Sequence, residues 1–246
     1  MASRTLLFIP TFNERKNVEF IYERIRKTGL ETDILFIDDS SPDGTGGLLD
    51  RLAQSDASLH VLHRSRKLGI GSAHAEGIRW AYDRGYQTLI TMDCDFTHKP
   101  EDIASFIENS RDVDVVVGSR YLRRESLKEW NLFRKTLTRA GHFLTNRLLK
   151  LPHDTTGAFR LYRLDRIPRG VFEIAGSHGY SFFFESLYIL DANGASIRDV
   201  PIDVPARAYG HSKMTLLDMM ASLILMFQIY FFSIVDHGRY RLKSNK

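Results

Sequence analysis

Several features of common protein classes are scarce or missing in this sequence. Its 246 residues include one cysteine, Cys94, which excludes an internal disulfide and fits a reducing compartment. The N-terminal segment, MASRTLLFIPTFNERKN, has an apolar run that is too short for a secretory signal peptide. The sequence shows no internal repeat, low-complexity stretch or flexible linker. We therefore expect a cytosolic protein with one folded domain, with or without a small appendage.

Two familiar phosphate-binding motifs are also missing. The segment Leu68–Ala73, LGIGSA, lacks the Gly-Lys-Ser/Thr ending of a P-loop and does not complete a Gly-x-Gly-x-x-Gly fingerprint. Neither a P-loop nucleotidase nor a dinucleotide-dependent oxidoreductase is therefore indicated. The segment fits either a helix N-terminus that binds a phosphate or a plain tight turn. No catalytic histidine stands out, and we interpret the scattered histidines as mostly structural, namely His60, His63, His74, His153 and His178.

The net charge is small, but it is unevenly distributed. The chain has 34 basic and 30 acidic side chains, a net charge of +4. Between Arg120 and Lys150 there are nine Lys or Arg residues and only two acids, Glu125 and Glu129, which gives this span +7. Such a span indicates either an anionic partner or a solvated helix face.

What the sequence does contain is a regular alternation of apolar and amphipathic segments. Short apolar runs predict five strands, at Leu6–Ile9, Ile34–Ile37, Leu59–Leu62, Leu89–Met92 and Val113–Val117. Helical patterns follow the first four, at Asn17–Thr28, Gly46–Gln54, Ser72–Arg84 and Glu101–Asn109. Strands that are apolar throughout are typical of parallel sheets covered on both faces. The sequence therefore predicts an α/β fold with an open, mostly parallel sheet wound by helices.

Polar segments follow four of these strands. In chain order they are PTFNE (10–14), DDSSPDGT (38–45), HRSRKLGIGSA (63–73) and DCD (93–95). Ligands of open α/β sheets bind outside the carboxyl ends of the strands, where loops and helix N-termini converge. We therefore expect these four loops to line one crevice.

The aspartates of DCD are the most informative residues of this crevice. Asp93 and Asp95 follow an apolar strand directly, and Asp38 and Asp39 add a second acidic pair from a neighbouring loop. A lone Asp-x-Asp is often a turn or a helix cap. Here Thr97 and Pro100 already provide the start of the next helix, so the pattern favours a site for Mg²⁺ or Mn²⁺, whose open positions take substrate phosphate oxygens.

Eight segments in register resemble the motifs of the polyprenyl-phosphate glycosyltransferases of glycosyltransferase family 2, most closely the dolichol-phosphate mannosyltransferases. They are PTFNE, DDSSPDGT, KLGIGSAHAEG, MDCDFTHKP, GSRY, DTTGAFRLY, GYSFFFE and RAYGHSK. The resemblance implies a GT-A (Rossmann-like) fold that binds a nucleotide sugar. It also implies a metal-dependent, inverting transfer of a hexose, typically mannose from GDP-mannose, to a polyprenyl phosphate of the dolichyl type, at the cytoplasmic face of a membrane.

The resemblance also implies roles for individual residues. A pocket for the nucleoside base and ribose would contain Pro10, Phe12, Glu14, Ile37 and Asp39. Asp93, Cys94 and Asp95 would form the DXD element, with Asp95 as the direct metal ligand and Asp93 between ribose and metal. The basic residues expected around the donor and acceptor phosphates are Arg120, Arg207 and Lys213, and Arg134 would grip the lipid phosphate.

Two departures from the family pattern concern the substrates. The family usually continues GSRY with a glycine-rich loop, whereas this chain has LRRES at Leu122–Ser126. Phe12 stands where tyrosine is common, which removes a hydroxyl from the base pocket. How the loop closes over the acceptor, and which base the donor carries, are therefore open at this point.

The chemistry of a phosphate acceptor explains the lack of a catalytic base. A phosphate monoester carries about −1.5 to −2 charges near neutral pH, so it is nucleophilic without a base. An alternative is a family-2 transferase that uses UDP-glucose or another donor, with undecaprenyl phosphate or a glycan hydroxyl as acceptor, and a hydroxyl would need a carboxylate base. A further alternative is a nucleic-acid-binding protein with a basic helix, but Asp93 and Asp95 would repel a polyanion.

The C-terminal part of the chain contains a long apolar segment. From Leu216 to Val235, sixteen of twenty residues are apolar, and a helix of this length reaches about 30 Å, enough to cross a bilayer. However, Asp218, Ser222 and Ser233 lie within about 60° of each other on a helical wheel, and basic residues flank both ends. We therefore expect a helix in the membrane interface, or a contact with a second copy or a membrane subunit; a helix buried in the core is the alternative.

Residues 1–213 would form the glycosyltransferase domain, and residues 214–246 would form this apolar helix and a basic tail.

Overall fold

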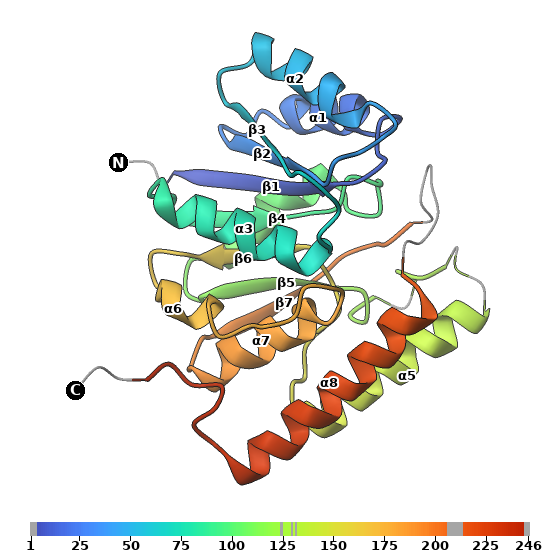
Figure 1. Cartoon of the computed structure of the whole chain (residues 1–246), viewed down its shortest axis with the longest axis vertical. Helices are drawn as coiled ribbons and strands as arrows, with labels where there is room; N and C mark the ends of the chain where they lie inside the picture. The colour runs from blue at the N-terminus through green and yellow to red at the C-terminus, as the bar shows by residue number, and fades with distance from the viewer. Residues whose placement is uncertain (1–3, 124, 129, 131, 206–213, 244–246) are drawn as a thin grey trace.

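A computed structural model describes residues 4–123, 125–128, 130, 132–205 and 214–243. Its centre is a seven-stranded sheet with the strand order β3-β2-β1-β4-β6-β5-β7 (Figure 1). The strands are β1 (Thr5–Thr11), β2 (Asp33–Asp38), β3 (Leu59–His63), β4 (Thr88–Thr91), β5 (Val115–Ser119), β6 (Arg160–Arg163) and β7 (Ile197–Pro201). Only β6 is antiparallel to its neighbours β4 and β5. The prediction of a mostly parallel α/β sheet is confirmed.

Helices occupy the connections between strands, and a last helix, α8, follows the final strand. They are α1 (Val18–Lys27), α2 (Thr45–Ser55), α3 (Ile70–Asp83), the 3-10 turn η1 (Pro100–Asp102), α4 (Ile103–Asn109), α5 (Leu132–Leu149), α6 (Arg169–Phe172), α7 (Phe182–Ala192) and α8 (Leu216–Val235). The five predicted strands and the four helices between them are confirmed within a few residues at their ends. The antiparallel strand β6 and the helix α7 were not predicted from their segments, DTTGAFRLY and GYSFFFESLYIL.

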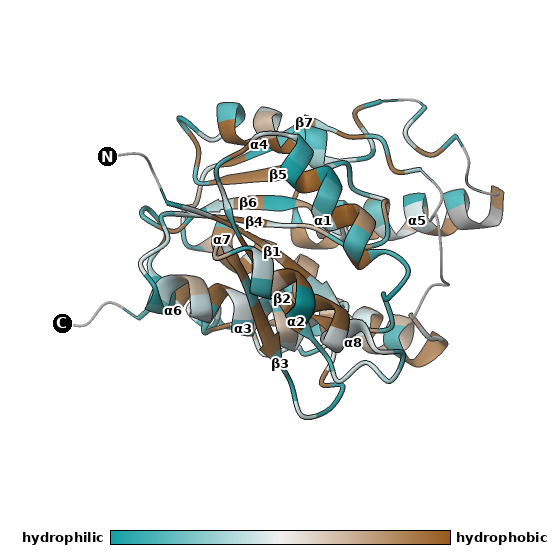
Figure 2. Cartoon of the chain, turned by 90° about the horizontal axis from the view of Figure 1, so that it is seen from above, coloured by the Kyte–Doolittle hydropathy of each residue, from teal (hydrophilic) through white to brown (hydrophobic). Residues whose placement is uncertain are grey.

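The sheet is covered on both faces, which explains why its strands are apolar throughout. Along β1, Leu6 and Phe8 pack into one core cluster and Leu7 and Ile9 into the other, all fully buried. The first cluster also receives α3, α7 and two residues of α8, while the second receives α1 and α4. In Figure 2 the hydrophobic residues concentrate on the central strands, whereas the outer helices alternate between hydrophobic and hydrophilic residues. Because β1, β2, β3 and β4 are paired in parallel, their carboxyl ends lie at one edge of the sheet.

The helices α5 and α8 lie side by side and project beyond the sheet (Figure 1). The helix α8 has the bounds predicted from the sequence, and a capping box between Thr215 and Asp218 fixes its start. Among the described residues it is the one helix long and apolar enough to cross a bilayer. Its most apolar stretch of 18 residues has a mean hydropathy of 1.7, and only 11% of that stretch is buried. This exposure contradicts the alternative of a helix buried in the core.

The polar side of α8 is turned toward α7 and the main cleft of the molecule. The Ser222 hydroxyl lies 3.0 Å from that of Ser181, immediately before α7, and the Ser233 hydroxyl donates to the Tyr230 carbonyl within α8 itself. Asp218 reaches the main cleft of the molecule. The apolar residues on the rest of the circumference are exposed, including Leu216, Leu217, Met220, Ile224, Phe227, Phe231 and Ile234. The surface of α8 that solvent can reach is therefore mostly apolar.

Candidate active site

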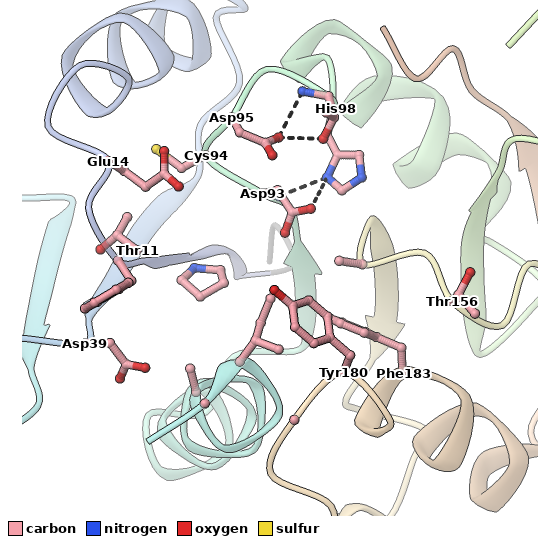
Figure 3. Close-up of a pocket in the computed structure, with 18 of the residues that line it drawn as sticks. Thr11, Glu14, Asp39, Asp93, Cys94, Asp95, His98, Thr156, Tyr180 and Phe183 are labelled. Carbon is pink, nitrogen blue, oxygen red and sulfur yellow. Dashed lines mark hydrogen bonds and ion pairs between the residues drawn. The ribbon is translucent and has the colours of Figure 1, made fainter. Parts of the chain in front are cut away.

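A cleft of about 300 Å³ opens at the carboxyl ends of the parallel strands (Figure 3). Eight of the residues singled out from the sequence line it, namely Pro10, Phe12, Glu14, Asp39, Asp93, Cys94, Asp95 and Arg120. Ile37 does not, because its side chain is fully buried in the core beneath. Arg207, Lys213 and the side chain of Arg134 lie outside the described residues. The structure thus brings the predicted base pocket, the DXD element and one predicted phosphate-binding arginine into one cavity.

The loops around this cleft contain unusual backbone conformations. Asn13, Ser40 and Phe96 have φ values of 56°, 58° and 63°, in the left-handed region that side chains with a Cβ rarely adopt. Each follows a strand that ends at the cleft, in order β1, β2 and β4. Strained residues persist where surrounding contacts hold them, and they are concentrated at functional sites. The hydrogen bonds that hold these loops are therefore part of the site.

The loops after β1 and β2 are tied to each other. The Asn13 amide donates to the Ser41 hydroxyl (2.9 Å), and the Glu14 amide donates to the Thr45 hydroxyl (3.0 Å). Asp38 accepts from the Ser41 amide and hydroxyl and from Thr11. Asp38 therefore organises these loops, and it is Asp39 that faces the cleft.

Asp39 is held by an arginine that sequence reasoning did not single out. The Arg64 guanidinium is buried and lies 2.7 Å from Asp39 and 3.1 Å from Glu76. Burial raises the pKa of Asp39 above its usual value, and the nearby Arg64 charge only partly offsets this. A buried carboxylate with a fixed orientation is well suited to accept N–H groups from a nucleoside base.

The second acidic group lies on the turn after β4 (Figure 3). Asp95 accepts from the Thr97 amide (3.2 Å) and hydroxyl (2.6 Å). The Asp93 amide donates to Nδ1 of His98 at 2.9 Å. Tyr180 lies across the cleft from Asp93, on the segment that leads into α7. The two carboxylates thus occupy one side of the cleft on a turn whose geometry is fixed by side-chain hydrogen bonds.

Arg120 supplies positive charge in the same cleft. Its Nε donates to Asp154 at 2.8 Å, and its backbone amide donates to the same oxygen. Burial opposes the Arg120 charge, but Asp154 and, more weakly, Tyr121 and Asp93 raise its pKa overall. Asp154 itself is fully buried. The guanidinium is therefore held in one orientation at the cleft, within electrostatic range of Asp93.

The LGIGSA segment is a tight packing element. A Cβ on Gly69 would lie 2.6 Å from the His178 carbonyl oxygen, and one on Gly71 would lie 2.6 Å from the Gly179 carbonyl oxygen. The Ser72 amide, at the start of α3, donates to the His178 carbonyl. These contacts show close packing and do not decide between the two interpretations left open above, a phosphate-binding helix N-terminus and a plain tight turn, which stay predictions. The glycines let the segment before α7 approach α3, and this approach places Gly179 and Tyr180 in the cleft.

The residues present fit a divalent cation whose remaining ligands come from a substrate. Within the described part of the chain no group of three or more His, Cys, Asp or Glu residues is arranged to hold a metal ion. Mg²⁺ commonly binds through one or two carboxylates together with substrate phosphates and water. Asp93 and Asp95 supply two such carboxylates in the same cleft.

Comparison with known proteins identifies the class of protein that this fold and cleft define. Residues 7–167 match the model of glycosyl transferase family 2. The chain belongs to this family, and it is a glycosyltransferase.

Two curated relatives are similar over most of their length. An undecaprenyl-phosphate mannosyltransferase from Micrococcus luteus is 38% identical over 213 residues, which cover 86% of this chain and 88% of the relative. A polyprenol monophosphomannose synthase from Mycolicibacterium smegmatis is 36% identical over 217 residues, which cover 87% and 82% of the two chains.

Solved structures with low sequence identity show the same fold. A Pyrobaculum calidifontis mannosyltransferase in complex with GDP-Man and Mn²⁺ has a TM-score of 0.52 at 17% identity and covers 84% of this chain and 58% of that one. The S. aureus protein TarS, residues 1–349, in complex with UDP-GlcNAc has a TM-score of 0.57 at 15% identity and covers 96% and 69%. The expected GT-A-like fold is confirmed.

Several residues of the cleft were not found from the sequence. They are Lys67, His98, Trp130, Tyr180 and Asp218. The Lys67 ammonium lies 4.3 Å from the centre of the Phe12 ring, and the Trp130 indole donates to the Val204 carbonyl at 3.1 Å. His98 carried a signal, since it is only three residues beyond Asp95. Trp130, Tyr180 and Asp218 come from the second half of the chain, where no local pattern indicated a position at the cleft.

Proposed function

We propose that this glycosyltransferase transfers mannose from GDP-mannose to a polyprenyl phosphate in a metal-dependent, inverting reaction. The observation that carries the proposal is one cleft lined by Asp93, Asp95 and Arg120, beside a pair of helices with exposed apolar residues. Acidic groups suit a cation-bound diphosphate, the arginine suits a phosphate, and the apolar helices suit a lipid surface. The names of both curated relatives support a lipid phosphate acceptor and mannose as the sugar.

The donor would occupy the side formed by the loops after β1, β2 and β4. Phe12 and Lys67 offer a flat, cationic surface, and Asp39 offers a fixed carboxylate for N–H groups of the base. Pro10, Glu14, Cys94 and the backbone near Ile37 complete the proposed pocket for base and ribose. Asp95 and Asp93 would hold Mg²⁺ or Mn²⁺, which supplies a Lewis acid for the departing diphosphate.

The acceptor phosphate would approach from the side of Arg120. Its oxygen attacks the anomeric carbon of the sugar as the bond from that carbon to the nucleoside diphosphate breaks, so the configuration inverts. A phosphate needs no deprotonation for this step. We propose that Arg120 and Arg134 hold the acceptor through the paired N–H groups of their guanidinium planes. Arg207 and Lys213 would act with them on the phosphates.

The position of α8 connects this chemistry to a membrane surface. Asp218, at its first turn, lines the cleft, while Leu223, Phe227 and Phe231 further along the helix are exposed. On α5 the exposed residues include both apolar Leu132 and Phe143 and basic Arg139. We propose that α5 and α8 lie in the interface of the cytoplasmic leaflet, with residues 214–246 as an appendage of a catalytic domain formed by residues 1–213. Basic residues near an anionic leaflet add about 1 kcal/mol each.

A transfer assay tests the proposal directly. Purified protein is incubated with labelled GDP-mannose, a polyprenyl phosphate in mixed vesicles, and Mn²⁺ or Mg²⁺. The expected product is a labelled lipid that extracts into organic solvent and disappears when a chelator is added. The matched control acceptor is the free polyprenol, whose hydroxyl would need a base and should stay unlabelled.

A donor panel identifies the nucleotide separately. Thermal stability is measured with GDP- and UDP-sugars, with and without Mn²⁺, because a ligand that binds only the native state stabilises it. We expect the largest increase in Tm for GDP-mannose together with Mn²⁺. Stabilisation by UDP-sugars alone, or labelling of free polyprenol, would contradict the proposal.

A further inference from the structure

The turn that carries both acidic residues is strained. Phe96, in its middle, has a φ of 63°, a left-handed conformation that is unfavourable for an L-residue other than glycine. Such a conformation persists only where surrounding contacts hold it. The positions of Asp93 and Asp95 therefore depend on the groups that fix the two ends of this turn.

One end of the turn is fixed within the acidic pair itself. Asp95 accepts two hydrogen bonds from Thr97, on its amide and its hydroxyl. This leaves the other end, at Asp93, to be fixed by another group.

That group is His98. Its Nδ1 accepts the Asp93 amide proton at 2.9 Å and lies 3.8 Å from the Asp93 carboxylate (Figure 3). A ring nitrogen that accepts from an amide carries no proton, so Nδ1 acts as an acceptor. The hydrogen bond spans the strained residue and fixes the backbone from which the Asp93 side chain projects.

The His98 ring is itself fixed by the core. Its side chain is 6% exposed and stacks on Phe159 with ring centres 5.0 Å apart. Phe159 stacks in turn on Phe106, at 4.1 Å. Both phenylalanines are fully buried. The imidazole is therefore held in place by the core, and its hydrogen bond holds the Asp93 amide in place in turn.

We propose that His98 is a positioning residue, whose Nδ1 sets the orientation of Asp93 and thereby the affinity of the cleft for a divalent cation and a nucleoside diphosphate. The second half of this statement rests on the function proposed above. The first half, that Nδ1 holds the Asp93 amide, concerns the ligand-free protein and can be tested alone.

Two substitutions separate the acceptor from the packing. His98→Phe keeps a ring against Phe159 and removes the acceptor, whereas His98→Asn places an amide oxygen near the position of Nδ1 and removes the stacking. His60→Phe is the matched control, because the His60 ring packs on Trp80 in a different part of the sheet.

The first measurement is hydrogen exchange at the Asp93 amide in the ligand-free protein. Loss of one buried hydrogen bond corresponds to about tenfold, so we expect the amide to exchange about tenfold faster in His98→Phe. Exchange in His98→Asn and His60→Phe should stay near that of the unchanged protein. Unchanged exchange in His98→Phe would overturn the proposal whatever the enzyme's substrates are.

The second measurement is calorimetric titration of GDP in the presence of Mn²⁺. We expect His98→Phe to bind about tenfold more weakly and His98→Asn to bind within about threefold of the unchanged protein, although His98→Asn should have the lower Tm. The opposite order, with binding following Tm, would mean that His98 acts only through packing and would overturn the proposal. If the unchanged protein binds neither GDP nor UDP, the proposed function fails, while the exchange result still decides the role of Nδ1.

Discussion

The two sides of the cleft are constructed in different ways. The proposed donor side consists of loops that follow the parallel strands β1, β2 and β4, so Glu14, Asp39 and Asp95 arrive at one edge through a repeated local unit. The proposed acceptor side combines residues that are distant in the chain, such as Arg120 with Asp154, and Trp130 with Val204. Regular connections place a loop automatically, whereas the second arrangement depends on long-range contacts that must all form together. Substitutions should therefore act locally on the donor side and more widely on the acceptor side.

The largest effect is expected from Asp95→Asn on the donor side. The amide oxygen can still accept from Thr97, so the turn should remain folded, but the charge that would bind the cation is lost. We expect the transfer rate to fall by about 10³-fold, equivalent to about 4 kcal/mol. The measurement is kcat/KM for GDP-mannose with Mn²⁺, alongside Tm. Asp50→Asn, which alters an exposed pair with His63, is the control, and undiminished turnover of Asp95→Asn would refute the metal assignment.

A somewhat smaller effect is expected from Arg120→Lys on the acceptor side. Lysine keeps a charge near the buried Asp154 but loses the planar pair of donors. We expect kcat/KM for the polyprenyl phosphate to fall by about 10²-fold while GDP affinity changes by less than about threefold. Steady-state kinetics with varied acceptor measure the first quantity and calorimetry the second. Arg123→Lys, three residues away in an exposed pair with Asp203, should behave normally. Equal losses for donor and acceptor would mean that the two sides are not separable at Arg120.

His74 tests the contact between the two sides, because it packs on Phe8 of β1 and on Phe182 and Phe183 of α7. Burial, together with the charges of Arg160 and His98, lowers its pKa to about 3. Between that value and about 6.5 the unfolded chain binds a proton that the folded chain does not, so stability falls as the pH decreases through this range.

From His74 alone we expect a loss of about 2 kcal/mol between pH 7 and pH 5. His74→Leu should remove this part of the pH dependence while keeping a stable fold, since leucine also fits an apolar site. Urea unfolding at both pH values measures it. If both proteins lose the same stability on acidification, His74 is not the group responsible.

The smallest effect is expected at the lipid-facing surface. Phe227→Asp replaces an exposed aromatic residue of α8 with a charge, and loss of its burial in the interface should weaken vesicle binding by about tenfold. Sedimentation with anionic vesicles measures this. Phe20 of α1 is similarly exposed, at 59% compared with 54%, so Phe20→Asp is a matched control that should bind normally. Equal binding of the two variants would place the membrane contact elsewhere.

The difference between the two sides also explains what could be predicted from the sequence. Apolar strands, helices and the polar loops after them repeat along the first half, and these local patterns located Asp39, Asp93 and Asp95. The bounds of α8 were predictable because sixteen of the twenty residues from Leu216 to Val235 are apolar. In contrast, the four residues of β6 are too few to show a periodicity, and Arg160 and Arg163 within it are polar.

The missed residues of the site share a physical cause. His98 and Arg64 act by hydrogen bonds or ion pairs to residues already identified, and a sequence does not show which partner a buried polar side chain will find. The polar residues of α8 are a similar case. They suggested a helix with one face toward lipid headgroups, but Ser222 instead contacts Ser181 at the start of α7.

The contact of Ser222 with Ser181 has a geometric consequence for the acceptor. Because its polar side is fixed on α7, α8 cannot rotate independently of the rest of the protein. A membrane that binds α8 therefore also fixes the distance and the tilt of the cleft opening relative to the membrane surface. Only the headgroup and the first carbons of a lipid could then rise to Arg120, and most of the hydrocarbon would stay in the leaflet. Polyprenyl phosphates of very different lengths should accordingly be used at similar rates.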